Sequence, residues 1–359
     1  MAIQPSPEAG PSTPPNGRLP NYKLCHSLSG HSRAVTACCF SADGSELISA
    51  GADGTVNIWD PKVGAHKSSF QAHRAGINDI SLSPDSLYLA TASDDNTILV
   101  FHTTSTSTAR HPTPLRRLVG HTAPVLSVAF SPKSNLVVSG SIDESAIIWD
   151  VRGGRVLRTL PAHSDMVWTV GWDNEGGMVI TGSADGLIRL WDASTGQCLK
   201  TLDNESNSPF SYAAFTPSST FLLSSTLSST IRIHNIYTSK VLKTLRAPGT
   251  LVSERFPCPV VIIPALEGST PLDRPDKPDA PRLGYSVDSR AAWIGSGSEN
   301  GKFVIWELSS RRVIQVLETP EPSTIPSPIV AVAASPDGRT IVTGHLEPEK
   351  VIRIWRDDA

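Results

Sequence analysis

One spacing constrains the fold of this chain more than any other feature. Four histidines each precede an aromatic residue by the same 28 positions. The pairs are His31 and Trp59, His73 and Phe101, His121 and Trp149, and His163 and Trp191. Because chance does not preserve such a spacing over four copies, the chain is built from repeats of one structural unit.

The repeat extends beyond these four copies. Strand-like segments that end near an aromatic or histidine recur seven times, centred on Trp59, Phe101, Trp149, Trp191, His234, Trp306 and Trp355. A period of about 40 to 45 residues is typical of propellers whose blades are four-stranded sheets. We therefore predict an all-β fold, a seven-bladed β-propeller.

Each of the first four copies carries the same polar set. An aspartate lies six positions before the aromatic residue, and a hydroxyl residue lies four positions before that aspartate. The aspartates are Asp53, Asp95, Asp143 and Asp185, and the hydroxyls are Ser49, Thr91, Ser139 and Thr181. Histidine, aspartate and serine together also suggest hydrolase chemistry, but four copies in one chain favour a structural role. We expect each set to form a buried hydrogen-bond network that includes the tryptophan indole.

Composition excludes several function classes. A net charge of −3 and dispersed Lys and Arg residues argue against direct nucleic-acid binding. Five cysteines without a CxxC pair or metal-ligand spacing suggest reduced thiols and no metal site. The sequence has neither an apolar run of about 20 residues nor a signal-peptide core, which argues against membrane insertion or secretion. We expect no cofactor.

Two segments depart from the repeat. Residues 1–20 are rich in Pro, Ser and Gly and are expected to form a disordered arm. Residues 21–359 are then the propeller, with a Pro-rich insertion at about 257–282 in blade six. Within it, Val260 to Ile263 is either part of this loop or a strand. An error in the gene model is another explanation for part of the insertion.

The repeated Gly-His and Trp-Asp pairs resemble those of the WD40-repeat family. Further phrases are similar to the WD-repeat-protein-five type, the propeller subunit of COMPASS and trithorax histone methyltransferase complexes; they include LPAHSD from Leu160, ADGLIRLWD from Ala184 and SGSEN from Ser296. In that family the N-terminus supplies the outermost strand of the last blade. The resemblance therefore implies that Tyr22 to Leu28 pairs with the final copy and closes the ring.

The resemblance also implies a function. It predicts a nuclear, non-catalytic scaffold, monomeric within a larger complex, that binds a methyltransferase subunit and companion subunits near the histone H3 tail; a cytoplasmic location stays open. The mouth of the central channel would accept an arginine side chain between two aromatic rings. By position, the mouth comprises Ala34, Ala52, Gly76, Asn78, Asp79, Asp94, Leu126, Trp168, Ser211 and Val330.

Several mouth positions depart from the family pattern. Leu126 replaces one stacking ring, Ala184 replaces a tyrosine at the rim, and the second ring lies near Phe256. Trp168 replaces a small hydroxyl residue, and it either offers a substitute stacking face or plugs the channel. Asp79 and Asp94 offer carboxylates to a cation, although Asp94 is equally well explained as a solvated turn residue.

The second implied surface is a shallow groove on blades five and six for a peptide from another subunit. By position, the groove comprises Ser218, Phe221, Ile233, Lys243 and Val287. Phe221 and Ile233 are alternatively ordinary sheet residues. A different function, that of a WD40 adaptor in another assembly such as a ubiquitin-ligase substrate receptor, is the alternative, because propellers bind many unrelated partners.

Overall fold

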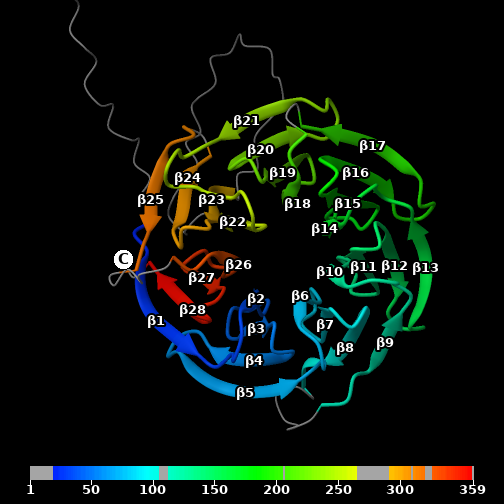
Figure 1. Cartoon of the computed structure of the whole chain (residues 1–359), viewed down its shortest axis with the longest axis horizontal. Coiled ribbons are helices and arrows are strands. Elements are labelled where there is room, and N and C mark those ends of the chain that lie inside the picture. Colours follow the sequence, from blue (N-terminus) through cyan, green and yellow to red (C-terminus); the bar gives the residue numbers. More distant parts are fainter. Residues whose placement is uncertain are drawn as a thin grey trace, which may run out of the picture.

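The computed structural model describes residues 19–104, 112–204, 207–264, 291–308, 310–319 and 326–357. Seven four-stranded antiparallel sheets surround one axis, and β2, β6, β10, β14, β18, β22 and β26 lie nearest to it (Figure 1). The predicted seven-bladed propeller is confirmed. The expected N-terminal arm, apart from Leu19 and Pro20, lies outside the described residues.

Within blades one to six, the strands run in chain order from the axis outward. The strands of blades one to three are β2 (Val35–Phe40), β3 (Leu47–Gly51), β4 (Thr55–Asp60), β5 (Ala65–Gln71), β6 (Ile77–Leu82), β7 (Tyr88–Ser93), β8 (Thr97–His102), β9 (Arg116–Val119), β10 (Val125–Phe130), β11 (Leu136–Ser141), β12 (Ala146–Asp150) and β13 (Arg155–Leu160). Those of blades four to six are β14 (Val167–Trp172), β15 (Met178–Ser183), β16 (Leu187–Asp192), β17 (Cys198–Asp203), β18 (Phe210–Phe215), β19 (Phe221–Thr226), β20 (Thr230–Asn235), β21 (Val241–Leu245), β22 (Val260–Pro264), β23 (Ala291–Gly297), β24 (Phe303–Glu307) and β25 (Val313–Leu317).

Blade seven joins the two ends of the chain. It comprises β26 (Ile329–Ala334), β27 (Thr340–His345) and β28 (Val351–Arg356), and its outermost strand is β1 (Lys23–Ser29). The pairing runs from Lys23 opposite Arg356 to Ser29 opposite Val351, which confirms the expected closure. Closing the ring in this way covers the outer edge of β28, which would otherwise be open to pairing with other chains.

Burial explains why the strands differ in composition. The second and third strands of each blade lie between neighbouring sheets, so both of their faces are covered; all five residues of β3 are buried. Outer strands are covered on one side only, and β13 buries Leu160 alone. The core therefore lies between blades: one cluster joins Ile98 and Val100 of blade two to Phe130 and Trp149 of blade three.

The segment Val260–Pro264 forms β22, the innermost strand of blade six. This result decides between the two interpretations of Val260 to Ile263 in favour of a strand. The rest of the expected insertion, from residue 265 to about 282, lies outside the described residues.

The described residues contain no helix long and apolar enough to cross a membrane. Within the same part of the chain, no group of three or more His, Cys, Asp or Glu side chains is arranged to hold a metal ion.

Candidate functional site

The predicted polar network is present in each of the first four blades. In blade three, His121 Nδ1 lies 2.8 Å from the Asp143 carboxylate, and His121 Nε2 lies 2.8 Å from Ser139 Oγ. Trp149 Nε1 donates to the same hydroxyl over 2.8 Å. The equivalent imidazole to carboxylate distances are 3.2 Å for His31 and Asp53, 2.9 Å for His73 and Asp95, and 2.9 Å for His163 and Asp185.

Burial excludes these four sets as nucleophilic sites. The hydroxyl residues Ser49, Thr91, Ser139 and Thr181 all have an exposed fraction of 0%. A nucleophile must reach a substrate, and these hydroxyls cannot. Their chemistry is structural: they connect the second strand of the blade to the loop that precedes its first strand.

The network sets the protonation of its members. Burial alone would raise the pKa of Asp143, but hydrogen bonds from Ser145, from the Thr122 amide and from His121 hold that pKa below its ordinary value. Burial lowers the pKa of His121 in spite of the neighbouring carboxylate. The networks of blades three and four therefore contain an ionised aspartate beside a neutral histidine at neutral pH.

Blades five and six use reduced versions of the network. In blade five, His234 takes the place of the tryptophan, and its Nε2 lies 2.9 Å from Ser224 Oγ. In blade six, Ser296 Oγ donates to the Gly297 carbonyl, and the buried Trp306 indole N–H has no acceptor among the described residues. Without the histidine that fixes the hydroxyl, the indole loses its partner.

Blade seven contains a network that sequence analysis missed. His345 lies on β27 itself, 3.1 Å from Thr343 Oγ1, and Arg353 Nη1 lies 3.0 Å from His345 Nε2. Glu349 is ion-paired to Arg353 at 2.6 Å. Thr343 and Trp355 are 12 positions apart instead of 10, so the spacing used for the other blades did not reveal this set.

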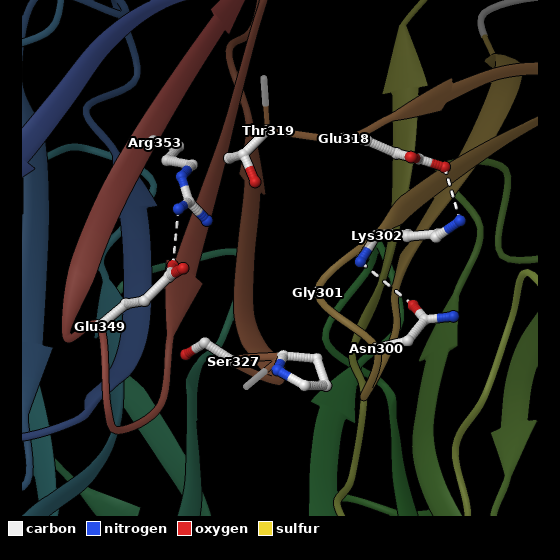
Figure 2. Close-up of a pocket in the computed structure, with 9 residues that line it drawn as sticks. Asn300, Gly301, Lys302, Glu318, Thr319, Ser327, Glu349 and Arg353 are labelled. Carbon is white, nitrogen blue, oxygen red and sulfur yellow. Dashed lines mark hydrogen bonds and ion pairs between the residues drawn. The ribbon is translucent and has the colours of Figure 1, made fainter. Parts of the chain in front are cut away.

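Arg353 and Glu349 also line a small polar pocket between blades six and seven, shown in Figure 2. Its cavity volume is about 140 Å³. Lys302 on the facing wall is paired with Glu318 at 2.7 Å. Because its cations are already matched by carboxylates, this pocket presents little unbalanced charge to a ligand.

Five of the ten predicted mouth residues share one structural position. The innermost strands of blades one to five and seven each contain a register irregularity, where one extra residue opposes the second strand. Such a β-bulge redirects the side chain of the extra residue. The extra residues are Thr36, Asn78, Leu126, Trp168, Ser211 and Val330.

Five of these residues were predicted, and Thr36 was missed. Thr36 follows His31 by five positions, as Asn78 follows His73, so the same spacing would have identified it. Its hydroxyl donates to the Ile77 carbonyl at 2.6 Å and connects blades one and two. Ser211 is turned inward, since its Oγ lies 2.6 Å from Ser225 Oγ and the residue is buried.

The structure brings the predicted residues of blades one and two together. The Ala52 amide donates to the Ala34 carbonyl, and the Asp94 amide donates to the Gly76 carbonyl. A Cβ atom added at Gly76 would lie 2.9 Å from Asp94 Oδ2 and 3.4 Å from Ala52, so glycine allows this close approach. Asn78 Nδ2 donates to Asp94 Oδ1 at 2.8 Å. Asp94 is exposed on this face.

Asp79 does not join Asp94 at the mouth. Its carboxylate accepts hydrogen bonds from the Val128 amide at 2.9 Å and from Ser127 Oγ at 3.0 Å, both on β10. Burial raises the pKa of Asp79 to about 6 despite these bonds. Asp79 thus connects the inner strands of blades two and three, and the expected pair of carboxylates at the mouth is not formed.

Phe256 lies in the loop that leads into β22, and its exposed fraction is 39%. One carboxylate oxygen of Glu299 anchors this loop by accepting from the amides of Glu254, Arg255 and Phe256 at 2.5, 2.6 and 2.9 Å. Glu299 occupies in blade six the position of Asp94 in blade two, immediately before the residue at the turn-aspartate position. Sequence analysis did not identify its role.

The predicted groove residues are divided between core and surface. Phe221 and Ile233 have exposed fractions of 0% and 3%, and both pack in the cluster between blades five and six. Ser218 is exposed in the turn before β19. Val287 lies outside the described residues. This burial favours the interpretation of Phe221 and Ile233 as sheet residues, and the groove as a partner surface stays a prediction.

Lys243 belongs to a recurrent contact between neighbouring blades. Its Nζ donates to the Leu308 carbonyl, in the turn between the third and fourth strands of the next blade. Three other cationic residues at the equivalent position of the outer strand make the same contact. These are Arg116 to Arg152 O at 2.9 Å, Arg158 to Ser194 O at 3.1 Å and Lys200 to Ile236 O at 2.7 Å. We call these four contacts the outer clamps; they give Lys243 a structural role that the sequence did not indicate.

Comparisons with known proteins agree with the fold. Residues 27–356 match the family model described as the WDR5 beta-propeller domain. The WD40 β-propeller domain of Doa1 superimposes with a TM-score of 0.73 at 22% identity, covering 95% of this chain and 98% of that chain. At this identity the likeness shows the fold alone.

Curated relatives match only in part. Protein hir-1 of Neurospora crassa is 31% identical over 150 residues, which are 35% of this chain and 14% of that protein. The COMPASS component SWD3 of Saccharomyces cerevisiae is 36% identical over 86 residues, which are 24% of this chain and 25% of SWD3. The chain thus spans a quarter or less of the length of these relatives.

Proposed function

Because this chain belongs to the WDR5 β-propeller family, we propose that it is a non-catalytic scaffold of a COMPASS-type histone lysine methyltransferase complex in the nucleus. The family match over residues 27–356 carries this proposal. The shorter similarity to a COMPASS component of yeast supports it. A rigid closed ring suits a scaffold, since its surfaces are held in place by seven packed sheets.

We further propose that the channel mouth binds an arginine-bearing peptide. Trp168 is the single aromatic among the six bulge residues and is half-buried. The face of an indole attracts a guanidinium. Asp94 supplies an exposed carboxylate on the same side of the propeller as Trp168. Phe256 offers a second exposed ring in the loop before β22.

Affinity purification of the tagged full chain tests the scaffold role. We expect a SET-domain methyltransferase and its companion subunits in the purified complex. Recovery of cullin-adaptor proteins without any methyltransferase would instead favour the alternative, a substrate receptor of a ubiquitin ligase. Because the chain is also similar to hir-1, the purified proteins should be searched for subunits of other assemblies as well.

Titration of an arginine-bearing histone H3 tail peptide tests the mouth. If Trp168 stacks on the guanidinium, Trp168→Ala should weaken binding by about tenfold or more, since a desolvated cation–π contact contributes about 2 kcal/mol. If Trp168 plugs the channel, the same change should strengthen binding. A peptide with lysine in place of arginine is the matched control. Unchanged affinity in Trp168→Ala would exclude both roles.

A further inference from the structure

A second hollow lies at the other end of the central channel. Its cavity volume is about 520 Å³. Its walls come from blades two to six, and residues from five consecutive blades can meet only near the axis (Figure 1). Most of the wall is formed at the ends of the inner strands and in the turns that follow them, with Leu223 of β19 and Val261 and Ile262 of β22 in addition, whereas the bulge residues of the mouth lie at the starts of the inner strands.

Four aromatic side chains contribute to the wall of this hollow, which we call the exit pocket. They are Phe130, Trp172, Tyr212 and Phe215. Val261, Ile262 and Leu223 add aliphatic side chains to this wall, and Ala214 and three prolines also line it. Large apolar side chains of a partner are the favoured ligands of such a wall, because aromatic anchors in pockets contribute most of the energy of peptide binding.

Three polar side chains of the wall are already engaged within the protein. Trp172 Nε1 donates to the Ala129 carbonyl at 3.0 Å, and Asp173 accepts from the Met178 amide at 2.8 Å. Thr216 Oγ1 donates to the Phe221 carbonyl at 3.1 Å. Burial, and to a smaller extent Asp79, raise the pKa of Tyr212 to about 12, which keeps its phenol neutral. The pocket interior therefore favours an apolar ligand group over a charged one.

The rim of the exit pocket has the opposite character, since it is acidic. It is formed by the described turns between first and second strands of blades two to five, at residues 83–87, 131–135, 173–177 and 216–220; the corresponding turns of blades one and seven, at residues 41–46 and 335–339, lie on the same face of the propeller. These turns carry the carboxylates of Asp43, Glu46, Asp85, Asp173, Glu175 and Asp337 and the cations of Lys133 and Arg339. Lys67 neutralises Glu46 at 3.0 Å, which leaves an excess of negative charge.

We propose that the exit pocket is a docking site for a partner protein segment in which a large apolar residue, such as tryptophan, is flanked by Lys and Arg. The apolar side chain fills the aromatic wall, and the flanking cations face the acidic turns. A pocket of about 520 Å³ accommodates such a side chain together with part of its backbone. Since this site lies at the opposite end of the channel, it is independent of the mouth proposed for arginine.

Fluorescence anisotropy with two labelled peptides tests this proposal on the full chain. The probes are Lys-Arg-Trp-Lys-Arg and its charge-reversed form Glu-Asp-Trp-Glu-Asp. At about 50 mM salt, the basic peptide should bind about tenfold or more tightly than the acidic one, because surface charges act at low ionic strength. Replacing its tryptophan with alanine should also weaken binding by about tenfold. Equal binding of the two tryptophan peptides would overturn the proposal.

Protein variants locate the site. Ala214 lines the pocket and is half-buried, so Ala214→Trp should fill it and reduce binding of the basic peptide by about tenfold or more. Glu175→Lys should reduce binding several-fold without touching the wall, and it remains informative if Ala214→Trp does not fold. Val330→Trp and Glu347→Lys, on the opposite face, are the matched controls and should leave this affinity unchanged.

Three outcomes would contradict the assignment. Loss of binding in the controls but not in Ala214→Trp would move the site to the mouth. Displacement of the basic peptide by a synthetic peptide of residues 265–290 would identify the chain itself as the occupant. A concentration-dependent dimer in sedimentation analysis, broken by Ala214→Trp, would identify a second copy. None of these results depends on the arginine titration, so either proposal can fail alone.

Discussion

Replacing Asp143 with alanine tests the polar network of blade three at its most connected side chain. The carboxylate accepts from His121 Nδ1 at 2.8 Å, from the Thr122 amide at 2.9 Å, and from the amide and hydroxyl of Ser145 at 3.1 and 2.6 Å. Alanine removes all four hydrogen bonds and leaves the His121 ring in place.

The expected loss of stability depends on whether each hydrogen-bond donor finds another acceptor once the carboxylate is removed. The Thr122 residue is exposed, so its amide can bind water, and the Ser145 hydroxyl can rotate. The His121 side chain is 0% exposed and cannot be hydrated in place. A buried donor without an acceptor costs about 1–3 kcal/mol, and lost hydrogen bonds to a charged group add to this. We expect Asp143→Ala to lower the free energy of unfolding by about 2 to 4 kcal/mol.

Equilibrium urea unfolding, followed by tryptophan fluorescence, measures the difference, and hydrogen exchange shows whether blade three opens first. The control is Asp150→Ala in the same blade. Its carboxylate accepts from the Arg152 amide at 3.1 Å, and its ion-pair partner Arg155 has a largely exposed side chain. Such contacts contribute about 0 to 1 kcal/mol. Equal stability of Asp143→Ala and Asp150→Ala would refute the reasoning.

Three further changes have defined outcomes. Burial raises the pKa of Asp79 to about 6, so its contribution to stability falls as the pH rises from about 4, the ordinary aspartate pKa, to about 6. Asp79→Asn should therefore raise the melting temperature at pH 8 but not at pH 4. Lys243→Glu should lower the melting temperature, because a carboxylate would face the Leu308 carbonyl, whereas Lys243→Arg should retain the outer clamp. Equal melting temperatures of the two variants would show that the clamp does not contribute to stability. In chemical denaturation, Trp149→Phe should lose about 1 kcal/mol more than Trp306→Phe, since only the Trp149 indole has an acceptor among the described residues; the reverse order would contradict this.

The fold was predictable because the residues that recur in the sequence are the ones that stabilise each blade. A buried hydroxyl, a turn aspartate and a loop histidine must keep a fixed spacing to meet, so the spacing of His121, Ser139 and Asp143 is enough to identify a blade. The polar network of blade seven escaped this reasoning, because its turn is two residues longer and the Thr343 hydroxyl is bonded by His345 of β27 instead of a loop histidine.

For the candidate site, the spacing of the repeat places residues at equivalent positions of their blades, but it does not give the directions of their side chains. Asp79 and Asp94 lie on one blade, yet Asp79 is bonded to the neighbouring inner strand and Asp94 is exposed. Spacing along a strand does not reveal a β-bulge, which decides where Trp168 and its equivalents point. The contact of Lys243 could not be predicted either, since its carbonyl partner, Leu308, belongs to the next blade.

The pairing of β1 with β28 has a consequence for synthesis. Lys23 meets Arg356, more than 300 residues later in the chain. At about 5 to 20 residues per second, translation of the intervening chain takes tens of seconds. During that time β1 has no strand to pair with, and six finished blades wait with an open gap. The ring can therefore close only after the last strand has been translated, and until then its unpaired strand edges are open to contact with other chains.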